Sequence, residues 1–137
     1  MESIFKEKLA PLALRVTLGL VCIYHGFLKI MIGGGTNWHP GLPTGWQLLI
    51  AWAEFVSGLA VLVGFRCRIS ATVVIGVTVG FLVWLQGWSL FHLPVHTLEP
   101  TFMLIMIAVA LMCMGAGEFS LDEKGSGLAT ARVTKRR

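Results

Sequence analysis

Three ionisable side chains lie inside long apolar runs of this sequence. His25 and Lys29 stand four residues apart in the stretch IYHGFLKI, and Glu54 stands in the stretch LLIAWAEFVSG. Residues four apart share one face of a helix, and a carboxylate beside an imidazole suits proton transfer. The residues therefore predict proton exchange at Glu54 and His25, the candidate catalytic pair, with Lys29 as a binding cation.

A structural ion pair explains the same residues equally well. Counted at 1.5 Å per residue, Lys29, His25 and Glu54 lie roughly 5, 10 and 13 Å inside the outer ends of their helices. An unpaired carboxylate within a membrane costs on the order of 2.5–3.5 kcal/mol. We therefore expect Glu54 to pair with His25 or Lys29. Arg15 lies in the inner half of the first helix, where we expect a structural role.

The composition indicates that these helices cross a membrane. Hydrophobic residues make up 55% of the 137 residues and charged residues 13%, against about 25% charged in soluble domains. The net charge is +4, but the basic residues gather between the apolar runs and at the chain ends. This placement is typical of membrane topology, so the expected partner is the lipid bilayer, and no nucleic-acid partner is expected.

Four segments are long enough to span a bilayer, which requires about 20 apolar residues each. They cover residues 11–32, 45–65, 69–88 and 99–117. The predicted fold is all-α, an up-down bundle of four transmembrane helices within residues 1–120, followed by a basic cytoplasmic tail, residues 121–137. Small residues favour close helix contacts in membranes, and Gly58, Gly76 and Gly80 are the expected packing positions.

The distribution of Lys and Arg predicts the orientation. The loops at residues 33–44 and 89–98 contain neither, whereas the N-terminus, the Arg66–Arg68 turn and the C-terminus are basic. The positive-inside rule places those basic parts in the cytoplasm and predicts a multi-pass protein of the cytoplasmic (inner) membrane. All five tryptophans then fall in the outer half, either as an interfacial belt or as walls of a site.

Metal and cofactor motifs are weak in this chain. His92 and His96 are the candidate metal ligands, but Pro94 between them argues against the regular helix that a His-x-x-x-His pair needs. No C-x-x-C-H haem attachment is present, and the three cysteines show no paired spacing. We therefore expect no metal, no haem and no covalently bound cofactor.

Three stretches in order resemble the DoxX family of small four-helix membrane proteins: LALRVTLGLVCIYHGFLKI, AEFVSGLAVLVGFRCR and GAGEFSLD. The resemblance is carried by Arg15, Gly19, His25, Gly26 and Lys29 in the first, Glu54, Gly58 and Gly64 in the second, and Gly115, Gly117, Phe119, Ser120, Leu121 and Asp122 in the third. It covers nearly the whole chain. Named members of that family are subunits of quinol-linked oxidases and of thiosulfate:quinone oxidoreductases, and another is implicated in assemblies that handle redox stress.

The resemblance implies a subunit of a quinone-linked membrane oxidoreductase that works with other redox subunits. In this reading His25, Lys29 and Glu54 line a quinone site in the outer half, walled by Tyr24, Trp52 and Trp84. One alternative is a non-catalytic scaffold or assembly subunit, in which Glu54 only locks two helices. Another is a small-molecule transporter, which would have to form a homo-oligomer because four spans are few.

Overall fold

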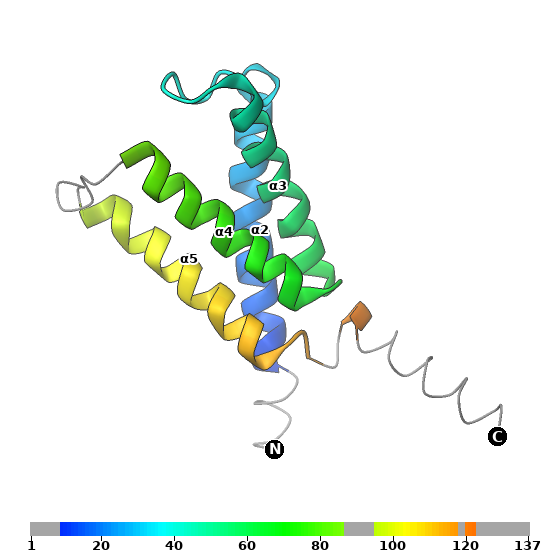
Figure 1. The fold of residues 1–137 in the computed structure, drawn as a ribbon. Helices are drawn as coiled ribbons and strands as arrows, with labels where there is room; N and C mark the ends of the chain where they lie inside the picture. The colour runs from blue at the N-terminus through cyan, green and yellow to red at the C-terminus, as the bar shows by residue number, and fades with distance from the viewer. Residues whose placement is uncertain (1–8, 87–94, 118–119, 123–137) are drawn as a thin grey trace, which may run out of the picture.

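Helices joined by short loops make up the described residues, which are 9–86, 95–117 and 120–122 of the computed structural model. The helices are α2 (Ala10–Met31), α3 (Thr44–Val63), α4 (Cys67–Gln86) and α5 (Val95–Met114), with a 3₁₀ turn at Gly33–Gly35 (Figure 1). These residues contain no strand, so the all-α prediction is confirmed.

Three of these helices are long and apolar enough to cross a membrane: α2, α3 and the Cys67–Trp84 part of α4. The apolar stretch described in α5, Glu99–Met114, is shorter. The first three helices begin within two residues of the predicted starts. The prediction for the fourth was wrong, because α5 begins at Val95 and extends the apolar run by four preceding residues. Pro100 therefore lies inside the helix and not in its first turn, and it supplies no N–H to the ladder.

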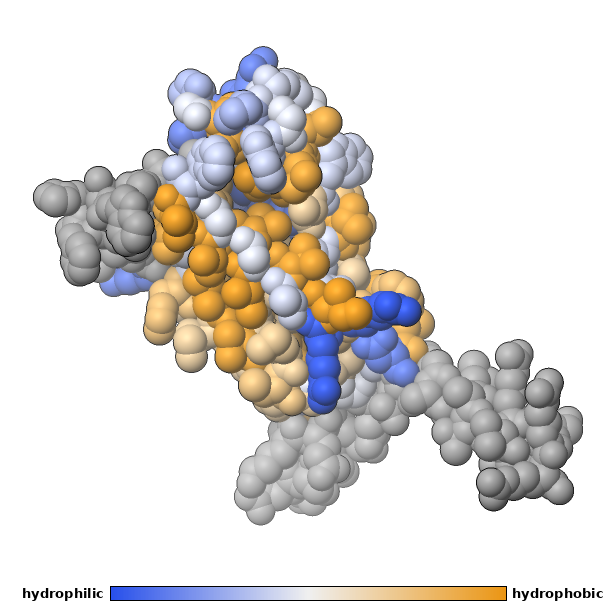
Figure 2. Space-filling view, viewed as in Figure 1, coloured by the Kyte–Doolittle hydropathy of each residue, from blue (hydrophilic) through white to orange (hydrophobic). Residues whose placement is uncertain are grey.

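Hydropathy divides the visible surface into zones (Figure 2). Apolar side chains cover the middle of the helices, while hydrophilic ones gather near the α3–α4 turn and paler, more polar ones at the end that carries residues 33–43. Many large apolar side chains are exposed on the helices, among them Leu20, Leu49 and Phe102. Such a surface is stable against lipid and not against water. The chain is therefore a membrane protein.

Glycines hold α2 and α3 together. A Cβ on Gly58 would lie 2.8 Å from the backbone nitrogen of Ile23, and one on Gly26 would lie 2.6 Å from that of Phe55. Real side chains do not tolerate such distances, so the two backbones touch where the side chain is absent. Small residues drive this kind of approach in membranes because lipid offers no hydrophobic force between helices. The close contact fixes the rotation and height of α2 against α3.

The turn between α3 and α4 is tied down by distant parts of the chain. Gly64 ends α3 in the left-handed conformation, with φ of 72°, which glycine adopts without strain. The carboxylate of Asp122 accepts hydrogen bonds from the backbone N–H groups of Arg66 (2.6 Å) and Cys67 (2.8 Å). Arg15, 1% exposed, places its guanidinium directly against Gly64. The end of the bundle that carries the α3–α4 turn is therefore closely packed.

Gly76 and Gly80 do not make the expected helix contact. A Cβ on either would meet no atom within 4 Å, and both residues line a cavity between α3 and α4. The spacing identified a shared face on α4, and this face is turned towards α3 across the cavity and not in contact with it. The prediction of a packing role within the chain was wrong for both glycines.

Candidate functional site

An ion pair joins α2 and α3 in the half of the bundle nearest the loop between these two helices. The Nζ of Lys29 donates to Oε2 of Glu54, and the Nδ1 of His25 lies 3.9 Å from Oε1 of the same carboxylate. The Glu54 side chain is 12% exposed and that of Lys29 20%, whereas that of His25 is 45% exposed. The structure thus brings the three residues together, with a half-exposed imidazole beside a mostly buried pair.

Gly26 explains how the pair can form. It lies between His25 and Lys29 in sequence and meets the backbone of Phe55, the residue after Glu54. The two helices therefore approach most closely at the height of the carboxylate. A larger residue in place of Gly26 would separate the helices just where the ammonium and the carboxylate must meet.

Two aromatic rings flank the Lys29 ammonium. Its Nζ lies 4.9 Å from the centre of the Trp38 ring and 5.2 Å from that of Phe81, and the two rings are 5.7 Å apart. Both distances are within the range of cation–π attraction. The rings come from the loop between α2 and α3 and from α4, so together with Glu54 of α3 three segments hold the cation.

Gln47 fixes the loop that carries Trp38. Its side chain donates to the carbonyl of Leu42 (2.6 Å) and accepts from the backbone N–H of His39 (3.1 Å). Its backbone carbonyl accepts from the indole N–H of Trp38 (3.2 Å). Gln47 is 4% exposed, so this is a buried and well-satisfied clamp. Sequence reasoning missed Gln47 and Phe81 as site residues and included Trp38 only as one of five tryptophans that could wall a site, although a glutamine in an apolar helix was a usable indication.

The ion pair lies in the wall of a cavity of about 520 Å³. Ligand-binding pockets commonly measure about 300–1,000 Å³. Besides the pair and His25, the lining includes Trp38 and Phe81, and Thr78 of α4 and Thr101 of α5. The cavity is thus apolar for the most part, with charged and hydroxyl groups at a few positions. It can accept a flat ring whose edge carries hydrogen-bond acceptors.

Three predicted wall residues do not line this cavity. Tyr24 is 61% exposed and Trp52 is 47% exposed, and both lie on lipid-facing sides of their helices. Each is one or two residues from a site residue, and such neighbours point to different faces. Trp84 lines the neighbouring apolar cavity between α3 and α4. The prediction of these walls was wrong, and Trp38 and Phe81 take their place.

The histidine candidates for a metal cannot be placed. His92 and the side chain of His96 lie outside the described residues. Among the residues that are described, no three His, Cys, Asp or Glu side chains cluster as metal ligands do. Cys22 and Cys67 are buried free thiols, and Cys113 is an exposed one.

One comparison with known proteins identifies a relationship. A family model described as DoxX matches residues 10–87, more than half of the chain. This match contains α2, α3 and α4 and therefore the whole Lys29–Glu54 pair. Neither a curated protein nor a solved structure matches the chain significantly.

Proposed function

The chain belongs to the DoxX family, and from this premise we propose that it is a membrane subunit of a quinone-linked oxidoreductase. The quinone ring would bind in the cavity beside Lys29 and Glu54. The observation that carries the proposal is the ion pair at the wall of a cavity of about 520 Å³, flanked by two aromatic rings. A quinone matches this lining because it is a flat ring with acceptor oxygens at its edge.

Each residue of the site has a role in this proposal that follows from its chemistry. Lys29 donates a hydrogen bond to a ring oxygen, and Trp38 and Phe81 confine the plane of the ring. Reduction of a quinone takes up two electrons and two protons; Glu54, the carboxylate of the ion pair, would take each proton from His25 and pass it to the ring. His25, 3.9 Å from that carboxylate and 45% exposed, exchanges the proton with the outside. The electrons come from a separate redox subunit.

The proposal includes a topology for the whole chain. The four helices alternate up and down through the cytoplasmic membrane, with both termini and the Arg66–Arg68 turn in the cytoplasm. The absence of Lys and Arg from residues 33–44 and 89–98 supports this orientation. The quinone cavity then lies in the outer half. The basic segment 121–137 faces the cytoplasm, where a soluble subunit or anionic lipid would meet it.

Replacement of Glu54 by Gln tests the proposal. The variant keeps the shape of the side chain but cannot exchange a proton at it. We expect quinone-dependent activity in native membranes to fall at least tenfold, while the amount of inserted protein stays the same. Glu99→Gln is the matched control, because Glu99 is an exposed carboxylate at the edge of another cavity. Unchanged activity in Glu54→Gln would refute the proton-transfer role.

A scaffold role is the second candidate, and one observation favours it. The ion pair is satisfied within the chain, and it lies where Gly26 and Gly58 already bring α2 and α3 into contact. In that case Glu54→Gln with His25→Asn would lower stability in detergent, and the activity of the complex would follow its abundance. Measuring activity per assembled complex distinguishes the two roles, because only the redox role predicts a loss at constant abundance.

A further inference from the structure

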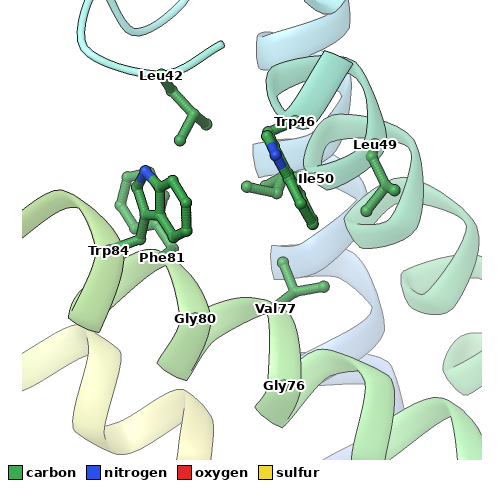
Figure 3. A pocket seen from close by; sticks show the side chains of 9 residues that line it. All are labelled: Leu42, Trp46, Leu49, Ile50, Gly76, Val77, Gly80, Phe81 and Trp84. Atoms are coloured by element: carbon green, nitrogen blue, oxygen red, sulfur yellow. The ribbon is translucent and has the colours of Figure 1, made fainter. Parts of the chain in front are cut away.

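A second cavity lies between α3 and α4, beside the cavity at the Lys29–Glu54 pair. It has a volume of about 210 Å³ and an entirely apolar lining. Figure 3 shows Trp46 and Ile50 projecting from α3 towards Phe81 and Trp84 on α4, with Leu42 above them from the outer loop. We call it the α3–α4 groove.

The groove exists because of two missing side chains. Gly76 and Gly80 lie one helical turn apart on α4 and line it, and a Cβ on either would meet nothing within 4 Å. Trp46 and Trp84 stand further out, with ring centres 6.0 Å apart. The result is a groove with a backbone floor and apolar walls, bounded at one end by the two tryptophan rings.

The groove adjoins the cavity at the Lys29–Glu54 pair. Val77 and Phe81 line both, so one face of each side chain is turned towards the groove and another towards the cavity. The same Phe81 ring lies 5.2 Å from the Lys29 ammonium. A molecule with its polar end at Lys29 would therefore have an apolar path leading away along α4, past Phe81.

We propose that the α3–α4 groove binds the hydrocarbon tail of the same amphiphile whose ring binds beside Lys29 and Glu54. This inference rests on the proposed function and extends it to the class of ligand, a quinone with a long apolar tail that enters from the membrane. The tail lies over Gly76 and Gly80, and the two tryptophans bound the end of the groove.

Binding of the tail in the groove orients the ligand and adds only modestly to its affinity. Lipid is as apolar as the groove, so transferring a tail from lipid into it gains van der Waals packing and little hydrophobic free energy. Filling the groove should therefore weaken binding by about fivefold, which corresponds to about 1 kcal/mol. The loss should appear only for ligands that have a tail.

Gly80→Leu and, separately, Gly76→Leu test the proposal by filling the floor of the groove. Gly45→Leu is the control, because Gly45 also has open space beside it but does not line the groove. Two probes are titrated into the full-length protein in mild detergent: a benzoquinone ring with a decyl tail, and the same ring with a methyl group. Comparing variant with wild type for each probe cancels the partition of the probe into micelles.

The proposal expects weaker decyl-quinone binding in both groove variants, unchanged methyl-quinone binding, and no effect in Gly45→Leu. Equal affinities for the decyl probe in all proteins would overturn it, since ordinary lipid would then fill the groove. An equal loss for both probes would also overturn it, because the variants would be distorting the ring site. A change in native mass in the variants would instead identify the groove as a contact between copies.

The same titration separates this inference from the function on which it rests. If wild type binds the methyl quinone and Lys29→Met does not, the ring site stands whatever the groove variants show. If wild type binds neither probe, the proposed function fails, and the inference fails with it.

Discussion

Replacing Lys29 and replacing Glu54 should each break their ion pair but should lower stability by different amounts. Lys29→Met leaves Glu54, whose side chain is 12% exposed and too short to reach the membrane surface. It also removes the cation that lies beside the Trp38 and Phe81 rings. Glu54→Gln leaves a longer cation that can extend towards the outer surface and keeps its aromatic contacts.

The magnitudes follow from these differences. Breaking a fully buried pair typically costs about 3–5 kcal/mol, and the partial exposure of both groups lowers this. We expect Lys29→Met to reduce the free energy of unfolding by about 2–3 kcal/mol, near the insertion cost of a single charge. Glu54→Gln should cost about 1–2 kcal/mol, because the ammonium can be rehydrated. The double variant should cost no more than Lys29→Met alone, so the coupling is about 1–2 kcal/mol.

Reversible unfolding in mixed micelles of a mild detergent and dodecyl sulfate, followed by the helical circular dichroism signal, measures these differences. Glu99→Gln should change stability by less than about 0.5 kcal/mol, as exposed substitutions usually do. The reasoning would be refuted if the two single losses added up in the double variant. It would also be refuted if Glu54→Gln were the more damaging change, since Lys29 would then be the trapped charge.

Three further predictions concern the groups that position the site. Gly26→Ala puts a Cβ 2.6 Å from the Phe55 nitrogen and should cost about 1–3 kcal/mol as overpacking does; an unfolding curve matching that of Gly45→Ala would contradict this. Gln47→Leu removes both side-chain bonds of the outer-loop clamp, so proteolysis of that loop should accelerate while global unfolding changes little; an unchanged cleavage rate would contradict this. Asp122→Ala removes the acceptor of two N–H groups at the start of α4 and should cost about 1 kcal/mol in the same unfolding assay; wild-type stability would show that water replaces the cap.

The sequence predicted the positions of the helices along the chain better than it predicted which face of each helix meets its neighbours. Apolar length and glycine breaks were enough to place α2, α3 and α4. The meeting of Glu54 with Lys29 followed from depth, since both lie in the outer half and an unpaired carboxylate in lipid is costly. The depth of a residue in the membrane follows from its position along the helix, so the sequence alone is enough to predict it.

The rotation of each helix could not be read in the same way. A membrane helix is apolar all round, so no amphipathic stripe marks the side that faces its neighbours. For this reason the glycines at Gly76 and Gly80 were assigned to packing although they face a groove. Tyr24 and Trp52 were placed on cavity walls although they face lipid. Phe81 lies beside the Lys29 ammonium. It stands in an apolar run, however, and nothing in that run marks it as a site residue.

The contact between Asp122 and the start of α4 has a consequence for biosynthesis. The backbone N–H groups at a helix start have no partner within the helix, and here those of Arg66 and Cys67 are satisfied by a residue more than fifty positions later. A ribosome makes Asp122 only after α5, so the α3–α4 hairpin stays incomplete until α5 has emerged. A prematurely terminated chain would display these bare amides at the membrane surface, and this would distinguish it from a finished one.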